Sequence, residues 1–175
     1  MTIKIKSALV VACLFITTHL SIGEETTNGS LKSLSDRLVE WHKQMADTSV
    51  EAKKAALEGL LPTKADIQLL FPNGADKLWE KLSMRYEQMK MNIDKVAEEL
   101  ARDEWIDIKV IDVRKDDPTG RYEKVLQVIP KDIPVCRIIK TGKRGGSAGS
   151  GSYLFVKGRW IFLQGLEAIP DFLNQ

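Results

Sequence analysis

The chain has 175 residues, with 26 basic and 24 acidic side chains and a formal net charge of +2. A charge this close to zero argues against a protein that binds nucleic acid or another polyanion through its overall charge. A chain of this length can bury the core of one domain.

The first residues have the composition of a secretory signal. Two lysines precede an apolar run at residues 8–16, and Ser21 and Gly23 supply the small side chains that signal peptidase recognises. The run is about half of the roughly 20 apolar residues that a membrane span needs. We therefore expect residues 1–23 to be cleaved off, with no membrane span remaining. The alternative is a lipoprotein signal, in which Cys13 would be lipidated.

Removal of the first 23 residues leaves 24 basic and 24 acidic side chains. It also leaves one histidine, His42, and one cysteine, Cys136. One thiol cannot form an intramolecular disulfide bond, and one residue of each kind cannot build a Cys/His zinc site. We therefore expect no bound metal and no cofactor. We expect the chain to act in the periplasm or outside the cell, with residues 24–29 as a flexible lead-in and residues 30–175 as one domain.

The N-terminal part of this domain has helical periodicity. Apolar residues recur three and four positions apart after Ser30, which predicts a capped helix as far as Met45. A second helix is expected at residues 49–61. Thr63 and Asp66 have the spacing of a capping box, which predicts that a short third helix begins there.

The strongest helical pattern covers residues 75–102, with Asn73 as its expected N-cap. A single continuous helix here would be about 42 Å long and would cross the whole domain. Seven apolar residues share one face of this segment: Leu78, Leu82, Tyr86, Met89, Ile93, Val96 and Leu100.

The apolar period changes to two from Trp105 onward, which predicts β-structure. Because no crossover helix separates the strands, the sheet is expected to be antiparallel. Lys157 and Gly158 would form the last hairpin turn, with positive φ at the glycine. A β-bulge is expected near Ile111, where the apolar parity changes. The expected strands are residues 105–113, 121–129, 135–140, 152–156 and 159–163. The sequence thus predicts an α+β domain: N-terminal helices with one long helix, followed by a curved antiparallel sheet of about five strands.

Residues 75–163 combine a long helix, the strand "WIDIKVIDVRKDD" and the final hairpin "GSYLFVKGRWIFLQGL". In the hairpin, Phe155 lies on an apolar strand, Gly158 in a tight turn and Trp160 on the return strand. This order resembles the nuclear-transport-factor-two-like superfamily of cone-shaped domains, in particular its small exported bacterial proteins. The resemblance implies a cavity between sheet and helices, which serves some members as a ligand pocket and others as an active site.

Basic side chains concentrate near the C-terminus. Between Ile133 and Leu166 there are six basic residues and no acid. One interpretation is an anion-facing patch for an acidic glycan, a phosphate or an acidic partner. The other is that these side chains are solvated or pair with Asp107, Asp112 or Glu123. The candidate binding residues are Arg137, Lys140, Lys143, Arg144 and Arg159.

No catalytic motif is present in the sequence. The glycine-rich residues 142–152 lack the order of a phosphate-binding loop and are typical of a flexible hairpin loop. His42 is expected on a helix surface, and Cys136 is expected to be a buried, inert thiol. Asp107 and Asp112 are the carboxylates that would act as acid or base if the domain were a cone-fold enzyme.

These observations favour an exported, non-enzymatic module that binds a ligand or a partner through its sheet or its basic end. The partner would be an acidic ligand or an envelope component. A cone-fold enzyme that uses a pocket carboxylate is the first alternative. A structural envelope protein is the second.

Overall fold

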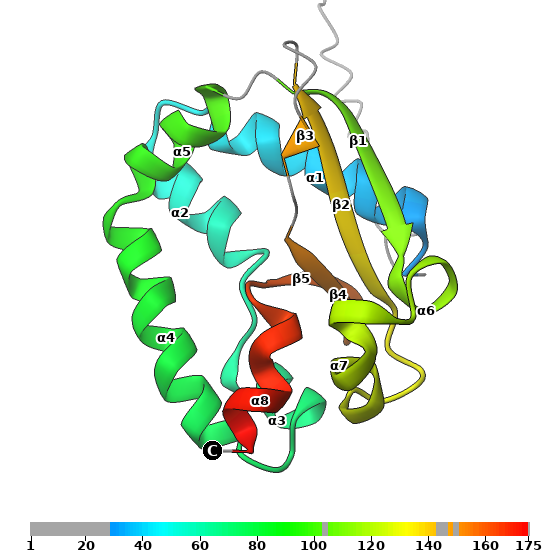
Figure 1. Cartoon of the computed structure of the whole chain (residues 1–175). Helices are drawn as coiled ribbons and strands as arrows, with labels where there is room; N and C mark the ends of the chain where they lie inside the picture. The colour runs from blue at the N-terminus through cyan, green and yellow to red at the C-terminus, as the bar shows by residue number, and fades with distance from the viewer. Residues whose placement is uncertain (1–28, 103–104, 143–146, 149–150, 175) are drawn as a thin grey trace, which may run out of the picture.

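The computed structural model describes residues 29–102, 105–142, 147–148 and 151–174. In this part of the chain, an antiparallel sheet forms the middle layer (Figure 1). Helix α1 (Leu31–Met45) crosses one face of the sheet, and α7 (Glu123–Val128) and α8 (Ile169–Leu173) lie on the other face. The chain is therefore α+β, as the sequence predicts.

The first three helices begin where the sequence predicts, although the second ends at Glu58 and not at Leu61. The Ser30 hydroxyl accepts a hydrogen bond from the backbone N–H of Ser33 at the start of α1. Ser49 caps α2 (Val50–Glu58) in the same way. Thr63 and Asp66 form the predicted capping box of α3 (Lys64–Leu70), each side chain accepting a hydrogen bond from the other residue's backbone N–H.

The expected single long helix is wrong, because residues 75–102 form two helices. These are α4 (Ala75–Met91) and α5 (Ile93–Arg102), and Figure 1 shows the bend between them. Asn92 ends α4 with φ −106° and ψ 33°, and its side-chain amide donates a hydrogen bond to the carbonyl of Gln88 at 2.8 Å. Asparagine competes for backbone hydrogen bonds in this way and so favours helix ends. The apolar period continues across the break, so periodicity alone predicts one helix.

The N-cap of α4 also differs from the expected Asn73. Gly74 occupies this position with φ 86°, in the left-handed region that glycine tolerates best. A Cβ atom at Gly74 would also approach the Leu173 side chain, within 2.7 Å of its Cδ2 atom. The turn before α4 therefore needs a glycine both for its backbone and for the space beside α8.

The sheet has four strands in the order β1-β2-β4-β5, with a two-residue strand β3 paired to β2. All neighbouring pairs are antiparallel. The bounds are β1 (Trp105–Asp112), β2 (Val135–Gly142), β3 (Ser147–Ala148), β4 (Ser152–Val156) and β5 (Arg159–Leu163). Four of the five predicted strands are thus present, and the sheet is antiparallel as predicted.

The expected strand at residues 121–129 is wrong. This segment forms a 3₁₀ turn, η1 (Gly120–Tyr122), and then α7. Tyr122, Val125 and Ile129 are buried, and their spacing of three and four is that of a helix face rather than a strand. Apolar residues in a short segment were compatible with both periods, and packing on the sheet selects the helix.

The expected bulge near Ile111 is also wrong. Strand β1 ends at Asp112, whose carboxylate accepts hydrogen bonds from the N–H groups of Arg114 and Lys115 and so caps α6 (Val113–Asp116). The change of apolar parity therefore marks where the chain leaves the sheet. The register irregularity of β1 lies at its other end, between Trp105 and Asp107.

The hairpin between β4 and β5 confirms the predicted turn. Lys157 and Gly158 both have positive φ, 49° and 80°. Two such residues match the right-handed twist of the flanking strands. The chain then closes with η2 (Leu166–Ala168) and α8. The sequence of residues 169–173 had instead predicted a closing turn with apolar side chains packed on the domain.

Two buried hydrogen bonds join the sheet to the layers on its two faces. Trp160 on β5 donates its indole N–H to the Ser33 hydroxyl of α1 at 3.0 Å. On the other face, the hydroxyls of Tyr122 and Ser152 are 3.1 Å apart. Because a buried polar group without a partner is costly, these bonds fix which helix packs on which face.

Candidate functional site

The strongest candidate site is a groove between α4 and the η2–α8 segment, which we name the α4–α8 groove. Its volume is about 370 Å³, within the range of small-molecule sites. Its apolar lining residues are Leu78, Leu82, Met84, Ala168, Ile169 and Phe172. Its polar lining residues are Lys81, Arg85, Gln88 and Gln164, and Gly165 completes the wall.

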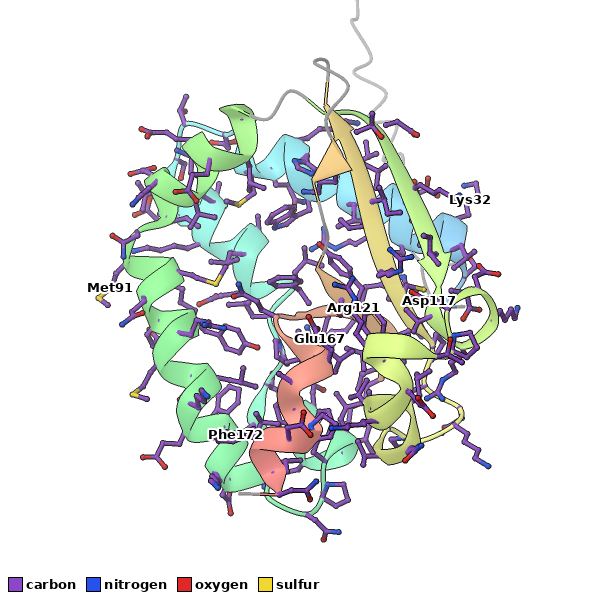
Figure 2. All side chains as sticks on the ribbon, viewed as in Figure 1. Lys32, Met91, Asp117, Arg121, Glu167 and Phe172 are labelled. Carbon is purple, nitrogen blue, oxygen red and sulfur yellow. The ribbon has the colours of Figure 1, made fainter. Side chains whose placement is uncertain are left out.

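The floor of the groove follows from the apolar stripe of α4. Leu78 and Leu82 lie one turn apart and are buried. Ile169, also buried, and the half-buried Phe172 supply the opposite wall. Figure 2 shows Phe172 between α4 and α8. Gly165, with φ 70°, turns the chain after β5 so that the closing helix lies beside α4.

The rim of the groove is positively charged. Lys77, Lys81 and Arg85 lie four residues apart on α4, which places them on one face of the helix. The ammonium groups of Lys77 and Lys81 lie 5.0 and 4.5 Å from the ring centroid of Phe172, a distance typical of cation–π contacts. Lys81 and Arg85 line the groove itself.

Two acidic side chains on the helices of the groove pair with lysines outside it. Asp76 pairs with Lys64 at 2.8 Å, and Asp171 pairs with Lys124 at 2.7 Å. Glu167 lies at the opposite end of the η2–α8 segment from Phe172 (Figure 2). Among the residues that the structure describes, no acid lines the groove. It therefore combines an apolar floor with charge of one sign.

A second hollow, of about 520 Å³, lies between α1 and β1. His42 lines it, half-buried, with its ring packed edge-on to Trp41. Burial, reinforced by the nearby charge of Lys140, lowers the pKa of His42 to about 4, so the imidazole is neutral at pH 7. Lys43 and Asp107 bring opposite charges to this hollow. Its remaining lining residues are Ser35, Val39, Leu100 and Ile108.

A third hollow, of about 430 Å³, lies beside the C-terminal end of the described chain. Asn73 and Asn174 are its polar side chains, and none of its described lining residues is charged. It therefore has fewer groups that could bind a charged ligand than the α4–α8 groove has. Its other lining residues are Phe71, Pro72, Gly74, Val128, Pro170 and Leu173.

The predicted basic residues do not converge where the structure describes them. Arg137 forms an ion pair of 3.0 Å with Asp117. By strand pairing, Arg137 and Arg159 lie on one face of the sheet and Lys140 on the other. Lys143 and Arg144 lie outside the described residues, so an anion site at that loop stays a prediction.

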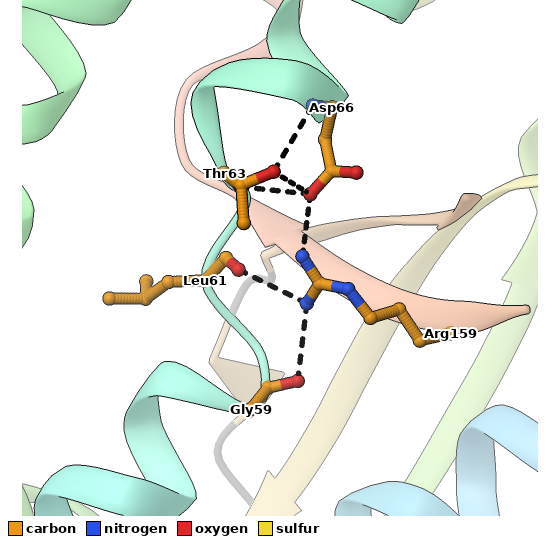
Figure 3. Close-up of polar contacts among 5 residues, drawn as sticks. All are labelled: Gly59, Leu61, Thr63, Asp66 and Arg159. Carbon is orange, nitrogen blue, oxygen red and sulfur yellow. Dashed lines mark hydrogen bonds and ion pairs between the residues drawn. The ribbon is translucent and has the colours of Figure 1, made fainter. Parts of the chain in front are cut away.

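Arg159 is part of a polar cluster that links β5 to the α2–α3 connection (Figure 3). Its guanidinium lies 2.5 Å from the carboxylate of Asp66 and donates to the carbonyls of Leu61 at 3.2 Å and Gly59 at 3.5 Å. The backbone N–H of Phe162 also donates to the carbonyl of Leu60. These bonds cover the outer edge of β5, a structural role that leaves Arg159 little capacity for a ligand.

The two candidate carboxylates lie apart. Asp107 is exposed, and Asp112 caps α6. Their partners across β2 are Thr141 and Cys136, five positions apart, so the two side chains lie on opposite faces of the sheet. The expected bulge that would have brought both to one face is absent from this part of β1.

Cys136 is buried, as predicted, with 1% of its surface exposed. Burial, with a smaller contribution from Asp112, raises the pKa of its thiol to about 12. A thiol reacts as the thiolate, so this environment makes it inert.

Within the described ranges, no group of histidine, cysteine, aspartate or glutamate side chains is arranged to hold a metal ion. Of the helices in those ranges, none is long and apolar enough to cross a lipid bilayer. Comparison with protein-family models, with curated proteins and with solved structures finds no match for this chain.

Proposed function

We propose that this protein is an exported, non-enzymatic module that binds a small ligand, and that the α4–α8 groove is its binding site. The observation that carries the proposal is the groove itself: a concave, apolar floor with a few polar groups at the rim, as ligand pockets have. Export rests on the signal-like composition of residues 1–23.

The enzymatic alternative has less support. It needs a titratable group with a perturbed environment in a pocket. His42 in the α1–β1 hollow has its pKa lowered to about 4, but its buried Nε2 atom has no hydrogen-bond partner among the described residues that would orient it for proton transfer. Asp107 is exposed and Asp112 is engaged as a helix cap. The α4–α8 groove contains lysine and arginine but, among its described residues, no acid, histidine or cysteine.

The experiment is a titration of the folded protein with the neutral fluorescent probe N-phenyl-1-naphthylamine, with two matched variants. Ala168→Phe adds a ring at an exposed position that lines the groove. Ala55→Phe makes the same change at an exposed position on α2. We expect saturable binding by the wild type and by Ala55→Phe, and none by Ala168→Phe. Absence of binding by the wild type, or equal binding by all three proteins, would contradict the proposal.

A further inference from the structure

We infer that the ligand of the α4–α8 groove is a single-chain amphiphile with a carboxylate head. This inference rests on the proposed function of the groove and adds the chemistry of its occupant. The apolar chain would lie along Leu78, Leu82 and Phe172, and the head would contact Arg85 and Lys81.

The sign of the head group follows from the charges of α4. Like charges four residues apart destabilise a helix, and Lys77, Lys81 and Arg85 form two such pairs in succession. Asp76 on α4 and Asp171 on α8 pair with Lys64 and Lys124. The described structure thus keeps a line of cations beside an apolar groove without a counter-ion in its lining, an arrangement that an anionic ligand would stabilise.

The choice of a carboxylate head follows from the side chains at the rim. Arg85 has a planar guanidinium, which matches the two oxygens of a carboxylate. The ammonium of Lys81 lies over the Phe172 ring, at the wall of the same groove. The side-chain amides of Gln88 and Gln164 can donate further hydrogen bonds.

The size of the groove favours a small molecule over a protein partner. A volume of about 370 Å³ is near the lower end for small-molecule pockets. Stable protein–protein interfaces need about 800 Å² of buried surface on each partner. One alkyl chain of medium length is small enough for a groove of this volume.

The experiment compares three ligands with the same ten-carbon chain and different heads: decanoate, decan-1-ol and decyltrimethylammonium. Each ligand is added, below its own micelle concentration, to the folded protein with bound N-phenyl-1-naphthylamine. The loss of probe fluorescence then gives the affinity of the ligand. We expect decanoate to bind about tenfold more tightly than decan-1-ol, as two partly exposed charge contacts allow, and the cationic ligand to bind least.

The matched variants assign this preference to the rim. In the double variant Lys81→Gln, Arg85→Gln, decanoate should bind no more tightly than decan-1-ol. Decan-1-ol should still bind in a saturable way, which shows that the groove is intact. The control Lys54→Gln, Lys95→Gln removes the same charge from exposed positions on α2 and α5 and should keep the preference.

The two proposals fail in different ways. Equal affinity of the wild type for decanoate and decan-1-ol would overturn the carboxylate inference and leave the groove as a binding site. Equal loss of the preference in both double variants would also overturn it, because bulk charge would then be the cause. If neither ligand nor the probe bound, the proposed function itself would be wrong.

Discussion

Arg159 on β5 and Asp66 on α3 form an ion pair of 2.5 Å across 93 residues of sequence. Asp66 is 3% exposed and also accepts hydrogen bonds from the N–H and the hydroxyl of Thr63. The same carboxylate therefore completes a helix cap and anchors the edge strand. Figure 3 shows how these contacts join β5 to the α2–α3 connection.

Replacement of Arg159 tests this anchor. Arg159→Met would leave the buried carboxylate of Asp66 without its counter-ion, and removal of one partner of a buried pair is strongly destabilising. Because Arg159 is about one third exposed, we expect a loss of about 2 kcal/mol in the free energy of unfolding, measured in urea. The control is Lys124→Met, which breaks the exposed pair with Asp171 and should cost under about 0.5 kcal/mol. Equal losses would show that the Arg159 pair is an ordinary surface contact.

The hairpin turn offers a stabilising substitution. Lys157 has φ 49°, a left-handed conformation that is strained for lysine. Asparagine tolerates it better, and Asn-Gly is the preferred pair for this turn. We expect Lys157→Asn to raise the free energy of unfolding by about 0.5 kcal/mol. Lys131→Asn, an exposed lysine without positive φ, should not do so. A destabilised Lys157→Asn protein would show that the turn has another conformation.

The pH dependence of stability tests the environment of His42. Its pKa is lowered from 6.5 to about 4 in the folded protein. Between these values the unfolded chain binds a proton that the folded chain does not, so stability falls as the pH decreases from about 6.5 toward 4. In His42→Gln this part of the decline should disappear, while Lys43 and Asp107 in the same hollow are unchanged. Parallel wild-type and variant curves, from urea unfolding at several pH values, would exclude a depressed pKa.

The reactivity of Cys136 tests the packing between the sheet and the helices. A buried thiol with its pKa raised to about 12 should react with a disulfide reagent at pH 8 much more slowly in the native protein than in urea. Similar rates in both states would mean that this part of the sheet opens readily.

Local signals in the sequence were sufficient for the caps of α1 and α3 and for the last hairpin, because Ser30, Thr63 with Asp66, and Lys157 with Gly158 act within a few residues. Two of the errors in the predicted elements have a common cause. Residues 121–129, and the residues near Ile111 where a bulge was expected, have apolar side chains at spacings compatible with a strand or a helix. Tertiary packing determines which of the two forms.

The α4–α8 groove was not predicted, because it depends on where η2 and α8 pack. Its one local signal was the spacing of Lys77, Lys81 and Arg85 on α4. The basic residues that were predicted lie close in sequence, but strand alternation separates Lys140 from Arg137 and Arg159. Basic residues that are close together in the sequence therefore do not form one basic patch among the described residues.

The most direct test of the binding proposal is an NMR titration of the ¹⁵N-labelled protein with decanoate. We expect saturable shift changes in the backbone amides of Lys81, Arg85, Ala168 and Phe172, on both walls of the groove. We expect none at Val39 and Ile108, which line the α1–β1 hollow. Changes confined to that hollow, or no saturable change, would contradict the binding proposal.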